Sequence, residues 1–258
     1  MLRPRIIPCL LLSHNGLVKT IQFKKRIYVG DPINAINIFN TKEVDELLIL
    51  DIDATTQATG PNMALIQDIA SECFMPLSYG GGVSTIEQME TLYAAGVEKI
   101  SLSSALFTQP QLLQQASRRF GASSVIATLD VKTNWRRQSL VYTHNGKKAT
   151  GLSIQETAKR MEAEGAGELC INMILRDGMM QGYDLELIAA ITAQLRIPVI
   201  ACGGAGSLMQ CRDVIRAGAS AAAAGSLFVF HGKHKAVLIQ YPSSEEIDSL
   251  FDIPSYEQ

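Results

Sequence analysis

The sequence lacks several features that would assign it to a simple class of proteins. No stretch reaches the roughly 18–20 uninterrupted apolar residues that a membrane-spanning helix needs. The formal net charge is only −2 at pH 7, whereas a nucleic-acid-binding protein presents a basic face. We therefore expect neither a membrane nor a nucleic acid as the partner.

Metal-ligand spacings and disulfide patterns are absent as well. The five cysteines are scattered without a C-x-x-C pair, and the four histidines form no metal-binding pattern. Such cysteines are typical of small core residues in a reducing compartment, so we expect a cytoplasmic protein with no metal and no cofactor. The N-terminal run MLRPRIIPCLLL faintly resembles a signal peptide, but it contains Pro8 and leads into polar residues without a cleavage site. It predicts a buried first strand.

What the sequence does contain is an internal repeat. Residues 79–106 run from a double glycine through a helical stretch and Ala-Gly to a short apolar strand and a serine, and residues 202–228 repeat this order. Glycines after a strand let the backbone approach an anion closely, and the helix that follows offers N–H donors. One unit alone is equally well explained by simple turns. Two units half a chain apart predict two phosphate sites that face each other across a barrel.

Apolar runs alternate with helical stretches eight times along the chain. We expect helices at 62–73, 84–96, 109–120, 153–164, 185–195 and 209–217, preceded by one that begins at Asp31-Pro32, and strands at 5–12, 46–53, 76–79, 100–103, 124–130, 168–172, 199–202 and 221–224. Chains of about 250 residues are typical of closed α/β barrels. The pattern predicts one (β/α)8 TIM barrel domain over 1–258, with half-barrels at about 1–122 and 123–230 and a tail at 231–258 that holds a short strand and a weak acidic helix.

Two connections are longer than the others. Residues 137–148 are predicted to form an inserted hairpin after the fifth strand, because Asn145-Gly146 is a strong signal for a two-residue type I′ turn. We expect His144 to lie in solvent at this hairpin. The connection after the first strand is extended, and it can fold Lys19 over the C-terminal face of the barrel.

In α/β barrels the active site lies at the C-terminal ends of the strands. The polar side chains expected there, besides the two glycine units, are Asp51, Asp53, Asp130, Lys132, Asn172 and Asp177. Asp130 is the best candidate for a general acid or base, because an apolar barrel mouth raises the pKa of a carboxylate by desolvation. The alternative is a structural aspartate that binds loop N–H groups, the role we favour for Asp51 and Asp53.

Four charged residues stand just before strands, at the opposite rim of the barrel. They are Arg5, Glu46, Lys99 and Glu168. Charges at this rim commonly serve solubility and ion pairing. Two bases and two acids that enter strands one, two, four and six can instead form a ring of ion pairs across the barrel floor.

These residues resemble the cyclase subunit family of imidazole glycerol phosphate synthase over nearly the whole chain, in RIIPCL, VGDP, VDELLILDI, YGGGV, EKISLSSA, GKKATG, RDGMMQGYD, GGAG and AGSLF. In that family the barrel takes ammonia from a glutaminase subunit docked on its floor, and a ring that matches the four charges gates the ammonia passage. The resemblance implies catalytic roles for Asp130 and Lys19. It also implies two phosphate sites, formed by Gly82, Ser103 and Ser104 at one end and by Asp177, Gly178, Gly204, Gly225 and Ser226 at the other.

The sequence departs from the family pattern at the mouth. The family uses two aspartates, at the ends of strands one and five; Asp130 matches the second, but Leu11 replaces the first. A leucine transfers no proton, and general acid–base catalysis is typically worth ~10²–10⁴-fold. The loop after the sixth strand reads MILRDGM at residues 173–179 where SIDRDGT is usual, and Ser103 replaces an asparagine. The charged residues at the floor thus match the family pattern, whereas several residues at the mouth differ from it.

This combination is similar to a paralogous branch, the glycosyl-amidation-associated proteins of surface-polysaccharide pathways, in IPCLLL, NGLVKT, YVGDPINAINIFN, EVDEL, LDIDAT and FVFHGKHKAVLIQYPS. In that branch the barrel, a glutaminase and a separate amidotransferase-like enzyme convert an acetamido group of a sugar to an amidine. The favoured hypothesis is therefore an ammonia-handling barrel with a phosphorylated or nucleotide-linked substrate. The alternatives are a cyclase–lyase of histidine biosynthesis in which Asp130 works alone, and a non-catalytic scaffold that activates the glutaminase.

Overall fold

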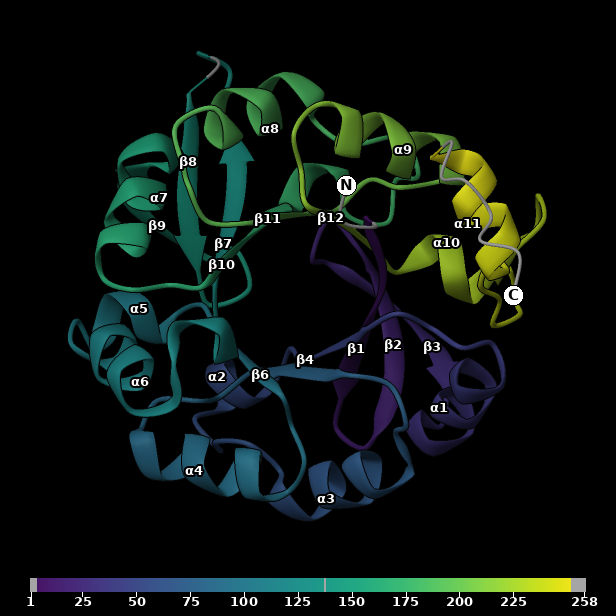
Figure 1. Ribbon diagram of the computed structural model, residues 1–258, viewed down its shortest axis with the longest axis horizontal. Coiled ribbons are helices and arrows are strands. Elements are labelled where there is room, and N and C mark those ends of the chain that lie inside the picture. Colours follow the sequence, from purple (N-terminus) through teal and green to yellow (C-terminus); the bar gives the residue numbers. More distant parts are fainter. Residues whose placement is uncertain (1–3, 137, 252–258) are drawn as a thin grey trace.

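The computed structural model describes residues 4–136 and 138–251. Eight parallel strands close into a barrel with helices around the outside, which confirms the predicted (β/α)8 architecture (Figure 1). Parallel pairing runs from strand to strand around the barrel, and the first and last of the eight strands pair with each other to close it. In order around the barrel, the strands are β1 (Arg5–Ser13), β4 (Leu47–Asp51), β5 (Leu77–Gly80), β6 (Lys99–Leu102), β7 (Val125–Thr133), β10 (Glu168–Met173), β11 (Val199–Cys202) and β12 (Ala221–Ala224).

The helices begin and end close to the predicted positions. Asp31 caps the first helix by accepting a hydrogen bond from the backbone N–H of Asn34 at 3.0 Å, and Pro32 occupies its first position. Helix α6 begins at Leu112, three residues later than predicted, because Pro110 disfavours helical backbone at the residue before it. The principal helices are α1 (Pro32–Thr41), α3 (Met63–Glu72), α4 (Ile86–Ala94), α6 (Leu112–Phe120), α7 (Ile154–Ala163), α8 (Leu185–Thr192) and α9 (Leu208–Arg216). Short helical segments are α2 (Ala54–Gln57), α5 (Ala105–Thr108), the 3₁₀ turns Ala122–Ser124 and Ile174–Arg176, and α10 (Ser226–Val229).

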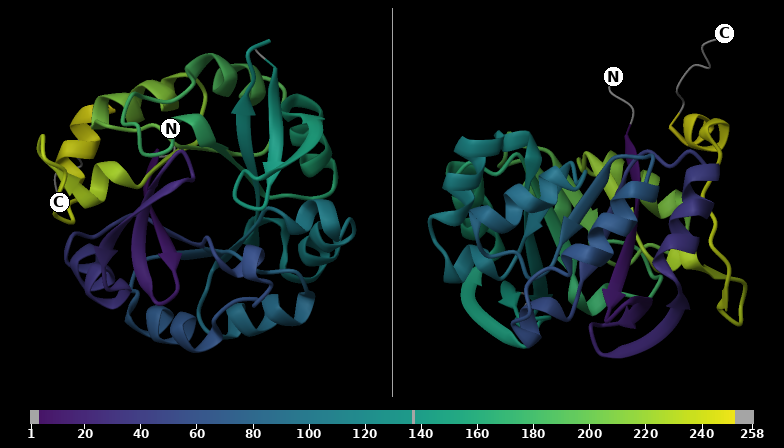
Figure 2. Two further views of the ribbon diagram at one scale, coloured as in Figure 1. Left: turned by 180° about the vertical axis from the view of Figure 1, so that it is seen from behind. Right: turned by 90° about the horizontal axis from the view of Figure 1, so that it is seen from below.

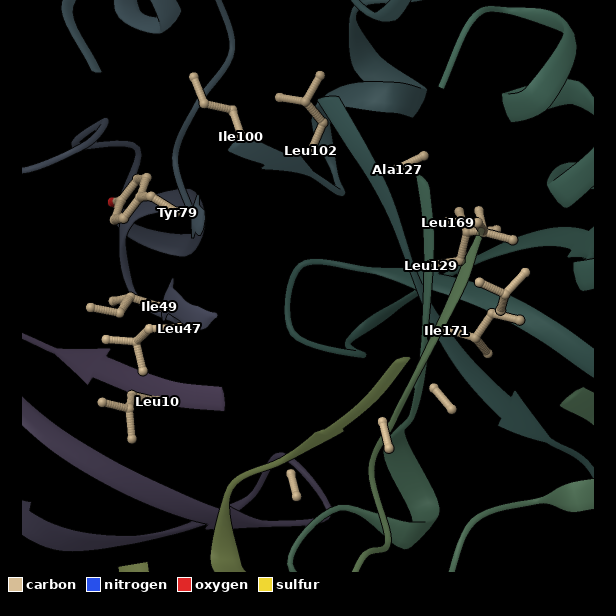
Figure 3. Packing of buried hydrophobic residues seen from close by; sticks show 14 of the residues in the cluster. Leu10, Leu47, Ile49, Tyr79, Ile100, Leu102, Ala127, Leu129, Leu169 and Ile171 are labelled. Atoms are coloured by element: carbon tan, nitrogen blue, oxygen red, sulfur yellow. The ribbon is translucent and has the colours of Figure 1, made fainter. Parts of the chain in front are cut away.

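The buried side chains form two clusters on the two faces of the barrel sheet. In β1, Ile6 and Leu10 belong to the larger cluster between strands and helices, part of which Figure 3 shows. Their neighbours Ile7, Cys9 and Leu11 belong to a smaller cluster built only from strand residues. Successive side chains of a strand point to opposite faces, so this second cluster fills the barrel interior. Burial on both faces explains why the strands read as continuous apolar runs.

Two β-hairpins extend the barrel sheet at the same end of the molecule (Figure 2). The first, β2 (Gly16–Ile21) with β3 (Lys25–Gly30), pairs antiparallel with β1. The second, β8 (Ser139–Thr143) with β9 (Lys148–Ser153), pairs antiparallel with β7 and confirms the predicted insertion. The predicted start of this insertion, Arg137, lies outside the described residues.

The predicted turn of the second hairpin was wrong in detail. Thr143 pairs with Lys148, so the loop has four residues, and His144, Asn145 and Gly146 all have positive φ. The expected solvent position of His144 was also wrong: this residue is half-buried, and its backbone N–H donates a hydrogen bond to Ser104 Oγ at 3.0 Å. The longer loop lets the tip fold back over the barrel mouth.

The C-terminal tail contains the predicted strand and helix. The short strands β13 (Phe230–His231) and β14 (Ala236–Val237) form a small hairpin, and α11 (Ser244–Leu250) follows. The hydroxyl of Tyr241 donates a hydrogen bond to the carbonyl of Ile6 at 2.7 Å, which ties the tail to the first strand. Among the described helices, none has the length and apolar character needed to cross a membrane.

Candidate active site at the barrel mouth

A cavity opens at the C-terminal ends of the barrel strands, where the sequence placed the candidate site. Gly82 does not line it: its N–H donates a hydrogen bond to Thr55 Oγ1 at 3.2 Å, and the neighbouring Gly81 faces the cavity instead. The two repeated glycine–serine units therefore face one common space. The predicted site residues that line it are Lys19, Ser103, Ser104, Asp130, Asp177, Gly178, Gly204, Gly225 and Ser226.

Asp130 is the carboxylate best placed for proton transfer. It lies near the end of β7, where Asn172 Nδ2 donates a hydrogen bond to Oδ1 at 3.1 Å and the hydroxyl of Ser103 donates to Oδ2 at 3.5 Å. Burial raises the pKa of Asp130 to about 7, although both hydrogen bonds act in the opposite direction. A carboxyl group with this pKa can both donate and accept a proton near neutral pH.

Lys19 reaches the cavity from β2 and is almost completely buried. Its Nζ lies 3.7 Å from Asp177 Oδ1 and packs so closely against Gly225 that any Cβ at that position would collide with it. The carboxylate of Asp177 also accepts hydrogen bonds from the Thr20 hydroxyl and, at 3.4 Å, from the N–H of Phe23. The Asp177 side chain therefore anchors the first hairpin, and Lys19 is held as a cation inside the site.

Asp51 and Asp53 hold the loop after β4, as predicted. Asp51 Oδ1 accepts backbone hydrogen bonds from the N–H groups of Asp53 at 2.8 Å and Ala54 at 3.0 Å. Asp53 accepts from Arg26 at 2.7 Å and from Ser13 at 2.8 Å. Burial would raise the pKa of Asp53, but the hydrogen bonds from Arg26 and Ser13 outweigh it and lower this pKa. Both carboxylates thus act as loop anchors.

Leu11 forms part of the cavity wall. It is 7% exposed, lies in β1 and pairs in register with Leu50 of β4, which lines the same cavity. This side of the mouth is apolar, and it faces a space whose other walls carry Asp130 and Lys19. Proton transfer from this side would need an acid or base, and Leu11 has no group that can donate or accept a proton.

The four charges at the other rim do form a closed ring. Arg5 bridges the two acids, at 2.5 Å from Glu46 and 3.0 Å from Glu168. Lys99 also bridges them, at 3.3 Å from Glu46 and 2.9 Å from Glu168. Burial would lower the pKa of Arg5, but its hydrogen bonds and charge attraction to both glutamates raise it. Each cation is thus shared between two acids, and all four charges compensate one another across the floor.

Between floor and mouth, the barrel interior carries hydroxyl groups on one side and thiols on the other. Ser78 donates a hydrogen bond to Glu46 Oε1 at 2.9 Å, and the hydroxyls of Ser101 and Thr128 lie 2.6 Å apart. On the other side, hydrogen bonding to Cys202 and burial raise the pKa of Cys9 far above its ordinary value. A thiol in this state is a poor nucleophile. Besides the apolar side chains of the smaller cluster, the interior therefore carries uncharged hydroxyl and thiol groups.

Asn145 and Arg26 are among the cavity-lining residues that sequence reasoning missed. Asn145 reaches the cavity from the tip of the second hairpin, and Arg26 reaches it from β3. The Asn-Gly pair indicated only a turn, and a single sequence carries no signal that this turn folds inward. In the described part of the chain, no group of three or more His, Cys, Asp or Glu side chains is arranged to hold a metal ion.

Comparison with known proteins shows the family of this chain. The family model described as "Histidine biosynthesis protein" matches residues 5–235. The chain belongs to this family. Within this family, the barrel is similar to HisF, the cyclase subunit of imidazole glycerol phosphate synthase. The family resemblance seen in the sequence is therefore confirmed.

Three relatives carry the provisional name of an imidazole glycerol phosphate synthase subunit. Subunit hisF2 of Pseudomonas aeruginosa is 48% identical over 249 residues, 96% of this chain and 99% of the relative. HisF of Leptospira interrogans is 46% identical over 253 residues, 97% of this chain and 100% of the relative. Subunit hisF3 of Vibrio vulnificus is 47% identical over 248 residues, 95% of each chain. The likeness therefore extends over the whole barrel.

Proposed function

We propose that this HisF-like barrel takes ammonia from a glutaminase subunit that docks on its floor. The observation that carries the proposal is the closed ring of Arg5, Glu46, Lys99 and Glu168. Alternating charges that compensate one another exclude ions from the barrel, because an ion would have to leave water and disrupt paired charges. Ammonia is small and neutral, so it can pass when one ion pair of the ring opens.

The interior above the ring suits the passage of such a molecule. The Ser78 hydroxyl contacts the ring, and the Ser101–Thr128 pair lies further along the strands toward the level of Asp130. Hydroxyl groups can exchange hydrogen bonds with ammonia without holding it as strongly as a charge would. Ammonia that enters at the floor would then emerge beside Asp130, Lys19 and the apolar wall at Leu11.

We propose further that the ammonia serves amidation of a nucleotide-linked sugar in surface-polysaccharide biosynthesis. In this reaction a separate amidotransferase-like enzyme attaches an activating group to the oxygen of an acetamido group. The ammonia nitrogen then bonds to the same carbon, and the oxygen departs with the activating group. The support comes from the mouth, where Leu11 supplies no second acid, and from the segments similar to the glycosyl-amidation branch. Asp130 alone, with a pKa of about 7, can manage the proton that ammonia loses when it attacks.

The decisive experiment measures glutamine hydrolysis by any glutaminase encoded alongside this protein, with and without the barrel, and then assays turnover of the imidazole precursor. Stimulated hydrolysis without imidazole product would support amidation. A glutaminase that neither binds the barrel nor responds to it would contradict the ammonia proposal altogether.

A second candidate function, formation of imidazole glycerol phosphate, is favoured by one observation. Asp130 has the pKa of a group that can serve as acid and base in turn, and it shares its cavity with Lys19 and both glycine–serine units. Rescue of a histidine auxotroph that lacks its own cyclase subunit would support this function. Failure to rescue despite good expression would count against it.

A further inference from the structure

The two hairpins at the mouth are built in the same way. Each follows the first strand of a predicted half-barrel and adds two antiparallel strands to it: β2 and β3 extend β1, and β8 and β9 extend β7. Both hairpins lie at the same end of the barrel (Figure 2). The pairing of strands therefore places two equivalent tips over one cavity.

At each tip, one side-chain amide donates a hydrogen bond to the opposite half of the barrel. Gln22 Nε2 donates a hydrogen bond to the carbonyl of Leu175, just beyond β10, at 2.9 Å. Asn145 Nδ2 donates to the carbonyl of Ile52, just beyond β4. Strands β4 and β10 are the second strands of their respective halves, so the two amide contacts correspond to each other.

The two amide residues also share an uncommon backbone conformation. Gln22 has φ 52° and Asn145 has φ 56°, in the left-handed region that non-glycine residues rarely adopt. Such conformations persist where surrounding contacts fix them, and they concentrate at functional sites. The strain is consistent with tips that are held in place.

Each tip contacts one of the two proposed phosphate sites. At the second hairpin, the backbone N–H of His144 donates to Ser104 Oγ at 3.0 Å. At the first, the N–H of Gln22 donates to the carbonyl of Asp177 at 2.9 Å, and Gly178 packs against the carbonyl of Thr20. Each hairpin tip is therefore held by specific hydrogen bonds or packing contacts beside one proposed phosphate site.

The contact at Ser104 organises the hydroxyl group. A hydroxyl has one O–H donor and two acceptor positions, so a bond accepted from His144 leaves the O–H free to donate. An oriented donor loses less entropy when an anion binds, which strengthens the site.

We propose that Asn145 and Gln22 are paired positioning residues, each of which holds one hairpin tip against one anion site: Asn145 for the site at Ser104, and Gln22 for the site at Gly178 and Ser226. This inference rests on the proposed phosphate sites. It gives each anion site its own support from the opposite half of the barrel.

The test uses Asn145→Gly and Gln22→Gly, two matched variants in which glycine accepts the left-handed backbone but removes the amide. Inorganic phosphate is titrated into each protein, and amide NMR shifts of Ser104 and Ser226 report the two sites separately. Asn145→Gly should weaken phosphate binding at Ser104 by about threefold to tenfold, the effect of one neutral hydrogen bond, with little change at Ser226. Gln22→Gly should do the reverse.

Two results would overturn the inference: unchanged affinity at both sites in both variants, or equal weakening at both sites in either one, which would indicate general loosening of the fold. Hydrogen exchange at the His144 amide should quicken only in Asn145→Gly. Wild-type protein that shows no phosphate shifts would overturn the phosphate sites and this role together. Site-selective weakening combined with failure to stimulate any glutaminase would overturn only the ammonia proposal.

Discussion

The acids of the floor ring and Asp130 at the mouth of this barrel lie in opposite electrostatic surroundings. At the floor, Glu46 and Glu168 each contact two cations within 3.3 Å, so each acid is paired with two basic side chains. At the mouth, Asp130 is held by two neutral donors, Asn172 and Ser103, and its pKa rises to about 7. One apolar barrel thus stabilises charges by pairing them at one end and makes a proton exchangeable at the other by leaving a carboxyl group without such pairing.

The largest expected effect comes from Asp130→Asn, which leaves the shape of the mouth intact but removes its titrating group. Ammonia-dependent product formation in the reconstituted system should fall by about 10²–10⁴-fold, because general acid–base catalysis supplies a factor of this size. Stimulation of the glutaminase should remain, since the floor is unchanged. In wild-type protein the rate should also depend on a group that titrates near pH 7, and the variant should lose this dependence.

If Asp130→Asn leaves product formation intact while a floor variant abolishes coupling, the barrel is a scaffold and not a catalyst. Only the floor of the barrel would then have a function of its own. This outcome is decided by two assays on the same preparation, glutamine hydrolysis and product formation.

The next largest effect is expected at the floor, for Lys99→Met. The change removes one of two cations shared by Glu46 and Glu168, which are largely buried. Breaking a buried pair by removing one partner typically costs about 3–5 kcal/mol in the free energy of unfolding. Chemical denaturation measures this loss, and the ratio of product formed to glutamine hydrolysed measures the loss of coupling.

A matched control is Arg119→Met, which removes the ion pair of an exposed arginine with Glu90 on the outer surface. An exposed pair of this kind contributes about 0–1 kcal/mol. Equal losses of stability in the two variants would contradict the interpretation of the floor as a cooperative ring.

The sequence predicted the barrel well because its signals are local or repeated. The apolar run of β1 and the Asp31-Pro32 helix start depend on nearest neighbours, and both are where they were expected. The ring could also be predicted, because each of its members precedes a strand and parallel strands all begin at one rim. Charge type and strand position left ordinary rim charges as the alternative, and the ion-pair distances decide for the ring.

Contacts made by the hairpin tips could not be predicted in this way. Asn145 lies 93 residues from Ile52, and Gln22 lies 153 residues from Leu175. The local sequence specifies that the chain turns at these points but not where the turn points. The same holds for Asp177, whose carboxylate binds the first hairpin, although the sequence pattern suggested only a phosphate site.

A smaller effect is expected from Leu11→Asp, which gives the mouth a second carboxyl group. The change removes a buried leucine from the cavity wall and should lower the free energy of unfolding by about 2–3 kcal/mol. If the missing acid separates this protein from imidazole formation, the variant should gain imidazole product that the wild type lacks. Leu50→Asp is the control: Leu50 occupies the paired position in β4, is partly buried and lines the same cavity, and no product is expected from this variant.

The smallest effect is expected from Arg26→Met, at the edge of the mouth, where one charge pair resembles those of the floor. The pKa of Asp53 is lowered by Arg26 and Ser13, so the folded protein releases this proton more readily than the unfolded chain does. The resulting stability is present above the ordinary aspartate pKa of about 4 and is lost as pH falls through the lower folded-state value.

Because Arg26 is half exposed, the variant should lose only about 1 kcal/mol at pH 7, and its difference from the wild type should be smaller at about pH 3. Urea denaturation at both pH values measures the difference. A loss that is the same at both pH values would show that the Arg26 side chain contributes by packing. A loss confined to the higher pH would show that the mouth, too, stabilises a carboxylate by pairing it with a cation, so that Asp130, held by the neutral donors Asn172 and Ser103, differs from Asp53 in this respect.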